Sequence, residues 1–367
     1  MKELTAFHDA ANCKTPEQLN ISKKIIGYMC SYVPEELIHA AGFHPMRLFS
    51  SKSDIVLAEN HLQAYCCSPV RGVLENSLSG RLDFLSGAVF PHTCDSIQRL
   101  SDIWRMNNRY EFFWDVVWPA KLNTQSALTY MKDVLIKFRQ DLENACGTSI
   151  SDETLHDSIL TYNTIRKKLS RIYELNAQNP GILNACDLLA IVKGTMIMDR
   201  DTAAMLLNTI VDQLEKKQPP DKPVKRIIIA GGICDSPDVY TIIEAAGGCV
   251  VADDLCTGQR WFKELTDETT DPISALVKRY SQRLPCPAKH NGLTKRGDHL
   301  VQLCQTHKAD GIVFMLLKFC DPHGFDYPYL KETLDKHHIK SILCELDDQQ
   351  QNSGQLSTRI ETFIHMI

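Results

Sequence analysis

The sequence predicts an α/β protein with two Rossmann-like, doubly wound parallel-sheet domains and a helical segment between them. Two stretches alternate apolar, strand-like runs with amphipathic helix patterns, which is typical of a mainly parallel sheet covered on both faces. Between these stretches the apolar residues recur with helical spacing. We therefore expect an N-terminal α/β domain over residues 1–123, a helical segment with a linker over 124–220, and a C-terminal α/β domain over 221–367.

Composition and charge narrow the class of protein. The 367 residues carry a net charge of −5 and no basic block, which argues against a nucleic-acid groove. The longest apolar stretches are far shorter than a membrane span, and the first residues lack the apolar core of a signal peptide. These features predict a soluble cytoplasmic protein without a nucleic-acid or membrane partner.

The first alternating stretch contains four expected strands. A proline and two glutamates at residues 34–36 begin a helix that ends at Gly42, since proline is favoured in the first turn and glycine just past the end. A further helix follows Cys94, with Ile97, Leu100 and Ile103 on one face. The expected strands cover residues 25–33, 45–50, 82–90 and 111–118.

The middle of the chain, from about residue 124 to 217, is predicted to be helical. Its clearest apolar seam steps by three or four residues, which is typical of intradomain or subunit packing. Residues 179–181 (NPG) break this pattern, a further helix covers 201–217, and 218–223 form a proline-rich linker. The seam consists of Leu155, Ile159, Tyr162, Ile165, Leu169, Ile172 and Leu175.

After the linker the strand and helix alternation resumes. The turn over residues 231–236 connects the first strand to the first helix of this stretch. We expect strands over 224–230, 249–252, 311–319 and 339–345, and helices over 237–246 and 329–336.

Common nucleotide and hydrolase motifs are absent. The segment 230–233 (AGGI) follows an expected strand, but it matches neither GxGxxG nor the P-loop. GxSxG and HExxH are also missing, and the 13 histidines show no ligand spacing.

Fourteen cysteines are the unusual feature of the composition, and none of them forms a CxxC pair. This excludes zinc ribbons, thioredoxin motifs and ferredoxin-type runs, so a metal centre would need cysteines far apart in the sequence. Cys67, Cys94, Cys234 and Cys320 lie where a helix is expected to begin. Helix N-termini at the carboxyl ends of strands stabilise thiolates, so three or four of these residues could hold an iron–sulfur cluster. Each one alone is better explained as a small core residue than as a ligand.

Ordered blocks along nearly the whole chain resemble the 2-hydroxyacyl-CoA dehydratase and benzoyl-CoA reductase family. The sequence around Cys94 (HTCDSIQRLSDIW) is most similar to the smaller, C-type subunits of benzoyl-CoA reductase. The blocks are 29–42 (MCSYVPEELIHAAG), 62–72 (LQAYCCSPVRG), 87–105, 227–262, 308–323 (KADGIVFMLLKFCDPH) and 353–363.

The resemblance implies a [4Fe–4S] cluster held in the interdomain crevice by Cys67, Cys94 and Cys320, with one iron left open. Cys67 is preferred to Cys66 because the family cysteine lies two residues after the aromatic at Tyr65. Such enzymes pair two homologous subunits, as a heterodimer or a homodimer. An ATP-dependent iron–sulfur activator protein supplies their electrons, and an acyl-CoA thioester reacts by a ketyl radical mechanism in anaerobic metabolism.

Three polar residues are candidate catalytic groups. Ser31 and Glu36 flank an expected strand end, and His92 lies two residues before Cys94. A glutamate in a first helical turn also simply favours the helix dipole, and a lone histidine can cap backbone groups.

Two alternatives stay open at this point. One is a double-cubane-type ATP-dependent reductase, which needs about six convergent cysteines and has Cys234, Cys256 and Cys286 as spare candidates. The other is a non-catalytic electron-relay or structural subunit of a heterodimer. The sequence does not choose among acyl-CoA substrates, or between dehydration and reduction. Cysteines interpreted as structural are Cys13, Cys30, Cys146, Cys186, Cys249, Cys286, Cys304 and Cys344.

Overall fold

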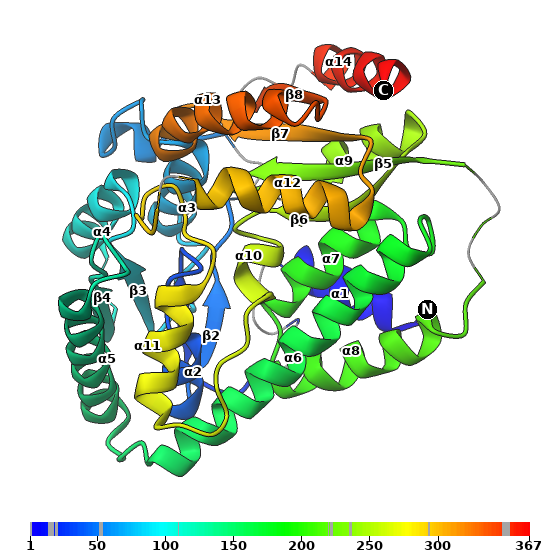
Figure 1. Ribbon diagram of the computed structural model, residues 1–367. Helices are drawn as coiled ribbons and strands as arrows, with labels where there is room; N and C mark the ends of the chain where they lie inside the picture. The colour runs from blue at the N-terminus through cyan, green and yellow to red at the C-terminus, as the bar shows by residue number, and fades with distance from the viewer. Residues whose placement is uncertain are drawn as a thin grey trace.

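Two four-stranded parallel sheets form the framework of the computed structural model (Figure 1). This confirms the predicted α/β class with two Rossmann-like units, whereas the domain boundaries remain a prediction. No helix among the described residues is both long and apolar enough to cross a lipid bilayer. The structure describes residues 2–13, 18, 21–50, 54–108, 110–218, 220, 223–234, 237–292, 294–346 and 353–367.

The first sheet has the strand order β2-β1-β3-β4, and every neighbouring pair is parallel. Each observed strand overlaps one of the predicted strands and is shorter than it. The expected strand over 82–90 begins only at Gly87, because the preceding residues form a turn in which the Leu85 N–H donates to the Leu82 carbonyl at 3.0 Å. The strands are β1 (Ile25–Tyr28), β2 (His44–Arg47), β3 (Gly87–Pro91) and β4 (Phe112–Val116).

The three helices beside the first sheet begin where the sequence indicates. Helix α2 follows Pro34, and Gly42 just after it has φ +80°, a conformation that favours glycine. These helices are α2 (Glu35–Ala40), α3 (Ser68–Leu78) and α4 (Asp95–Asn107), with a 3₁₀ turn η2 (Ala58–Asn60). Helix α1 (Lys2–Ala11) instead packs against helices of the middle segment.

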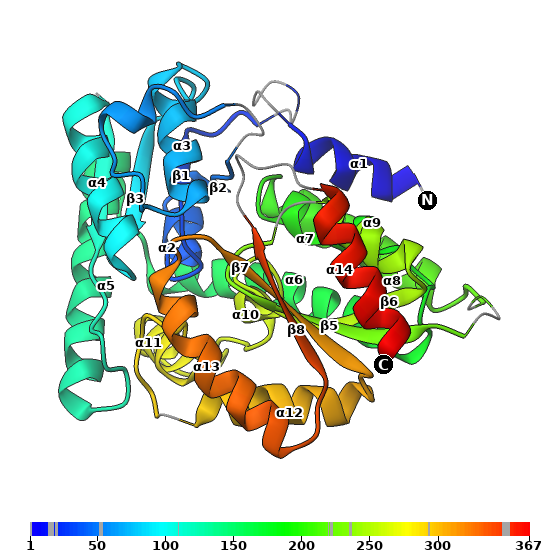
Figure 2. The same ribbon diagram turned by 90° about the horizontal axis from the view of Figure 1, so that it is seen from above.

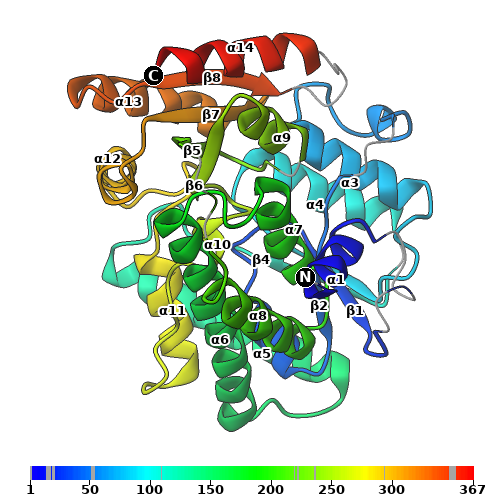
Figure 3. The ribbon, with the colours of Figure 1, turned by 90° about the vertical axis from the view of Figure 1, so that its right-hand side faces the viewer.

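Four helices follow β4, and each starts at a side chain that accepts an N–H from its first turn. All seven residues of the predicted apolar seam are buried on α6. Helix α6 contacts α2 on one side and β6 on the other, so it connects the two sheets, and α8 lies beside it (Figure 3). The helices are α5 (Gln125–Cys146), α6 (Asp152–Gln178), α7 (Ala185–Thr195) and α8 (Arg200–Leu214).

The second sheet repeats the strand order of the first, as β6-β5-β7-β8. Helices α12 and α13 cover one face, and α9 and α14 cover the other (Figure 2). Helix α13 begins earlier than the predicted helix over 329–336. The strands are β5 (Lys225–Gly231), β6 (Gly248–Asp254), β7 (Gly311–Leu317) and β8 (Ser341–Leu346); the helices are α9 (Pro237–Ala245), α10 (Gln259–Phe262), α11 (Pro272–Gln282), α12 (Lys295–His307), α13 (Asp321–Lys336) and α14 (Ser353–Met366).

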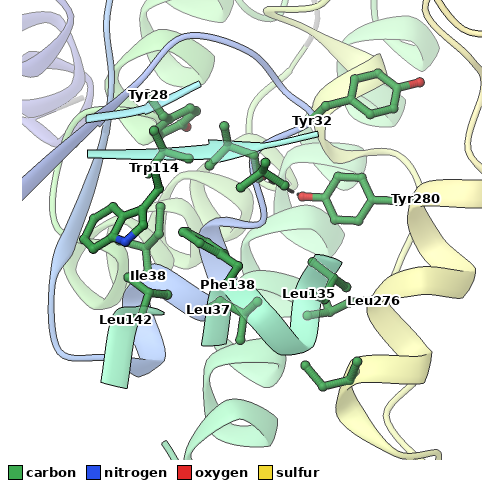
Figure 4. Packing of buried hydrophobic residues seen from close by; sticks show 14 of the residues in the cluster. Tyr28, Tyr32, Leu37, Ile38, Trp114, Leu135, Phe138, Leu142, Leu276 and Tyr280 are labelled. Atoms are coloured by element: carbon green, nitrogen blue, oxygen red, sulfur yellow. Dashed lines mark hydrogen bonds between the residues drawn. The ribbon is translucent and has the colours of Figure 1, made fainter. Parts of the chain in front are cut away.

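One helix of the later chain packs onto the first sheet. Helix α11 lies beside α5 and shares its hydrophobic core (Figure 4). Its Tyr280 hydroxyl donates to the Val33 carbonyl at 2.7 Å, and its ring stacks on Trp118 with centroids 4.9 Å apart. The chain that follows α11 therefore starts beside the carboxyl edge of the first sheet.

Candidate cluster site

Three predicted ligands are the N-cap residues of helices. Cys94 caps α4 directly after β3, Cys320 caps α13 directly after β7, and Cys67 caps α3. Cys94 and Cys320 thus hold equivalent positions, each following the third strand of its sheet. The positive end of a helix dipole favours a thiolate at such a position.

Six thiols, which we call the thiol cluster, influence one another electrostatically. Thiolate charge on Cys286, Cys30 or Cys320 would raise the pKa of Cys94. Charge on Cys67 or Cys256 would likewise raise the pKa of Cys320. The structure therefore gathers thiols from both sheets into one region. The thiol cluster consists of Cys30, Cys67, Cys94, Cys256, Cys286 and Cys320.

Burial favours the protonated form of three of these thiols, those of Cys94, Cys286 and Cys320. It raises the pKa of Cys94 and Cys320 well above the ordinary value of a thiol, and that of Cys286 to about 12. The backbone N–H groups of Ile97 and His323 act in the opposite direction on Cys94 and Cys320, respectively. Metal binding at these sulfurs would therefore release protons.

Cys30 is a residue whose position the sequence did not reveal. The expected strand over 25–33 would place it inside the sheet, where we interpreted it as structural. Strand β1 ends at Tyr28, so Cys30 lies beyond the carboxyl end, and its sulfur accepts a hydrogen bond from the Thr93 hydroxyl at 3.2 Å. Its proximity to Cys94 was hidden because the length of a short buried strand is poorly determined by sequence.

Neighbouring cysteines at residues 66 and 67 have different surroundings. Cys66 is 1% exposed and packs with Leu62 and Val70 in the core of the first sheet, whereas Cys67 is half-buried at the start of α3. This arrangement favours the choice of Cys67 as the ligand, which stays a prediction. Cys234, the second-tier candidate, is buried in the hydrophobic core beside β5.

Two buried cations lie near the thiols without a carboxylate partner. The Lys289 ammonium donates to the Trp118 carbonyl at 3.0 Å and to the His92 carbonyl at 3.5 Å. The Arg283 guanidinium donates to the Ser31 carbonyl at 2.8 Å and to the Ser31 hydroxyl at 3.1 Å. In the described part of the chain, neither cation has a carboxylate oxygen within ion-pairing distance. Excess positive charge at this place favours an anionic group among the thiols.

A third buried cation, Arg260, has a carboxylate partner but also a guanidinium nitrogen that lacks a hydrogen bond in the described part of the chain. Arg260 is buried, its Nε lies 3.2 Å from Asp254 Oδ1, and its Nη2 donates to the Gly231 carbonyl. Burial raises the pKa of Asp254, but Arg260 and Arg296 outweigh burial and hold it well below its usual range. The Arg260 Nη1 group has no hydrogen-bond partner among the residues that the structure describes.

The predicted catalytic residues lie in three separate environments. Ser31 is held by Arg283, as described above. Glu36 is fully buried and forms an ion pair with Arg166. Burial raises the pKa of Glu36, but the charge of Arg166 and Arg279 outweighs burial, so its carboxyl stays ionised. His92 Nε2 donates to the Asp115 carboxylate at 3.0 Å. Their catalytic roles remain predictions.

The described residues contain no group of three cysteine, histidine or carboxylate side chains arranged to hold a single metal ion. A four-iron cluster is larger than one ion, so its thiolates lie farther apart than the ligands of a mononuclear site. The donor set fits such a cluster in chemistry, because cysteine thiolates are its usual ligands and the flanking cations suit its negative charge. Two surface cavities of about 380 and 650 Å³ are lined by other parts of the chain.

The chain is thus a two-sheet α/β protein in which several cysteines lie beyond the carboxyl ends of strands. Residues 30–367 match the family model described as 2-hydroxyglutaryl-CoA dehydratase, D-component, so the chain belongs to this family. This confirms the resemblance stated above and places the chain among enzyme subunits of the dehydratase and reductase type.

Curated relatives are similar over nearly their whole length. The (R)-phenyllactyl-CoA dehydratase beta subunit of Clostridium sporogenes is 30% identical, over 93% of this chain and 91% of the relative. The C-type subunit of benzoyl-CoA reductase from Thauera aromatica is 28% identical, over 91% and 88%. The beta subunit of (R)-2-hydroxyglutaryl-CoA dehydratase from Acidaminococcus fermentans is 25% identical, over 93% and 92%.

Proposed function

We propose that this chain is the iron–sulfur subunit of a 2-hydroxyacyl-CoA dehydratase or benzoyl-CoA reductase type enzyme that acts on an acyl-CoA thioester. The observation that carries the proposal is the gathering of Cys67, Cys94 and Cys320 from both sheets, each at a helix N-terminus. Family membership supports the same assignment. When bound there, a [4Fe–4S] cluster with an open iron supplies low-potential, one-electron radical chemistry on the thioester.

The protein's own groups bind, orient and exclude water in this proposal. The three thiolates hold the cluster, and the N-termini of α3, α4 and α13 stabilise their charge. Asp115 fixes the ring of His92 through Nε2, which leaves Nδ1 to exchange a proton with the reacting group. Arg283 holds Ser31 in place, and Arg166 holds Glu36 in its ionised form, so both side chains are positioned without substrate.

The proposed partners follow from the family and from the names of the relatives. Those relatives are subunits of larger enzymes, which supports assembly with a homologous subunit, as a heterodimer or a homodimer. We further propose that an ATP-dependent iron–sulfur activator delivers the electrons, in the cytoplasm of an anaerobic cell. The chain offers no P-loop of its own for that ATP step.

A second candidate function is favoured by the remaining thiols. Cys30, Cys256 and Cys286 belong to the thiol cluster in addition to the three proposed ligands. Six convergent cysteines are what a double-cubane-type ATP-dependent reductase requires. In that case these three residues hold a second cubane next to the first.

Anaerobic purification with iron and sulfide counted per chain tests both candidates. About four irons per chain support the single cluster, and about eight support the double cubane. None in a well-folded protein under strict anaerobiosis overturns both. Replacement of Cys67, Cys94 or Cys320 by alanine should abolish the cluster absorbance. The control variant Cys146→Ala, on α5, should retain full iron. Full iron in all three ligand variants would show that the ligand assignment is wrong.

Two further readouts separate the remaining choices. In a double cubane, Cys30→Ala, Cys256→Ala and Cys286→Ala should each lower the iron content, whereas a single cluster should survive all three. Addition of an acyl-CoA thioester should change the electron paramagnetic resonance spectrum of the reduced cluster if this subunit binds substrate. An unchanged spectrum, with the partner subunit present, would instead indicate the electron-relay role.

A further inference from the structure

Lys289 reaches the thiol cluster from a loop that crosses between the two sheets. The loop joins α11 to α12 and runs beside the segment that leaves β4. The His290 N–H donates to the Ala120 carbonyl at 2.7 Å, and the Leu122 N–H donates to the His290 carbonyl at 3.1 Å. Two backbone hydrogen bonds therefore fix the position of Lys289 next to the first sheet.

The side chain of Lys289 is buried among carbonyls and thiols. It is 5% exposed, and two of its N–H groups are directed at the Trp118 and His92 carbonyls. The thiols whose charge acts on its ammonium group belong to Cys30, Cys286 and Cys94. Among the described residues, the third N–H of the Lys289 ammonium group has no hydrogen-bond acceptor.

Burying a cation without a negatively charged partner costs desolvation free energy. Arg166, Arg200 and Arg296 are equally buried but each contacts a carboxylate, which offsets the loss of water. Lys289 has only neutral carbonyls, and burial lowers its pKa. Arg283 also lacks a carboxylate partner, but its guanidinium donates to Ser31 and lies over the Tyr32 ring at 4.5 Å. Lys289 is the cation on which three thiols act, those of Cys30, Cys286 and Cys94, and its ammonium group has no carboxylate beside it in the described part of the chain.

We propose that Lys289 is a fixed positive charge beside the cluster, held by the Trp118 and His92 carbonyls, that stabilises the reduced form of the cluster and so raises its reduction potential. This inference rests on the proposed function. Reduction adds one electron, supplied by the activator in the enzyme and by dithionite in the test, and thus one negative charge. A nearby cation stabilises that charge more strongly in a buried site than in water. Lys289 acts here as a positioning and electrostatic residue, because it forms no bond with substrate.

The midpoint potential of the cluster in the full-length protein tests this role. Three variants are compared with the wild type in anaerobic redox titrations monitored by electron paramagnetic resonance. Lys289→Met removes the charge at similar length, Lys289→Arg keeps the charge, and Lys121→Met removes an exposed lysine from the adjoining segment. We expect a more negative potential in Lys289→Met alone.

Each outcome decides one question. An unchanged potential in Lys289→Met, with full iron, would overturn the inference and leave the proposed function intact. Loss of iron from Lys289→Met but not from Lys289→Arg would support a role of the charge. Loss of iron from both variants would show a purely structural role of Lys289 and would overturn the inference. Absence of iron from the wild type would be a failure of the proposed function instead.

Discussion

Buried charges between the two sheets are of two kinds. On the side of α2, α6 and α8, each carboxylate meets a guanidinium: Glu35 contacts Arg200, and Glu36 contacts Arg166. On the side of the thiol cluster, Lys289 donates only to carbonyls and lies near thiols. The first arrangement is electrostatically complete within the chain, whereas the second lacks a negative charge. The buried ion pairs stabilise the fold by themselves, whereas Lys289 would be stabilised further by a bound anion, as the proposed function requires.

Removal of Arg200 should have the largest effect on stability. Its guanidinium is fully buried and binds Glu35 and the Tyr162 hydroxyl as well as the Pro45 carbonyl. Arg200→Met would leave the Glu35 carboxylate buried without its cation, which costs about 3–5 kcal/mol of unfolding free energy. Denaturant unfolding of the cluster-free protein measures this loss.

The matched control for Arg200 is a surface arginine in an ion pair. Arg171 contacts Glu215 at 2.9 Å but is well exposed, so Arg171→Met should change the unfolding free energy by no more than about 1 kcal/mol. Equal losses in the two variants would contradict the view that the buried pairs hold the fold together.

Adjacent carboxylates at the end of β6 allow a finer test. Asp254 has two guanidinium partners, whereas Asp253 accepts from the Tyr173 hydroxyl at 2.6 Å and the Gln259 N–H at 2.8 Å. Burial raises the pKa of Asp253 to about 6, despite these hydrogen bonds. Hydrogen bonds alone therefore do not keep the pKa of a buried carboxyl low, whereas the two guanidinium groups beside Asp254 do.

The sign of the pH effect follows from this shift. The folded pKa of Asp253 lies above the unfolded value of about 3.9, so its stabilising contribution is present below that value and is lost as the pH rises through about 6. Asp253→Asn does not titrate. We expect the stability of the wild type relative to this variant to fall by about 3 kcal/mol between about pH 3.5 and 7.5, measured by denaturant unfolding across that range. A constant difference would show that Asp253 remains ionised in the fold.

Part of this site could be predicted from the sequence. The positions of Cys94 and Cys320 at helix starts could be predicted because each follows a buried apolar run and precedes a helix start signal, which are local patterns. Both sheets and the apolar seam of α6 were predicted for the same reason. The helix over 329–336 was predicted too short, because its first turns include exposed positions and a proline at 328.

The rest depends on contacts between distant residues. Glu36 and Arg166 are 130 residues apart, Lys289 and Trp118 are 171 apart, and Arg283 and Ser31 are 252 apart. No periodicity or motif marks such pairs in a single sequence. For that reason the sequence relates the first-turn glutamate only to the helix dipole or the site, and it gives no indication of a role for Lys289.

The smallest predicted effect concerns the two adjacent cysteines at the start of α3. Cys66→Ala removes one buried sulfur from the core formed with Leu62 and Val70, which should cost about 1–2 kcal/mol of unfolding free energy and leave the iron content unchanged. Cys67→Ala removes a half-buried N-cap thiol, so it should cost less stability but abolish the cluster absorbance. Iron content and denaturant unfolding of both variants thus dissociate packing from ligation at neighbouring positions. Loss of iron in Cys66→Ala, with retention in Cys67→Ala, would exchange the two assignments and would place the ligand on the core side of α3.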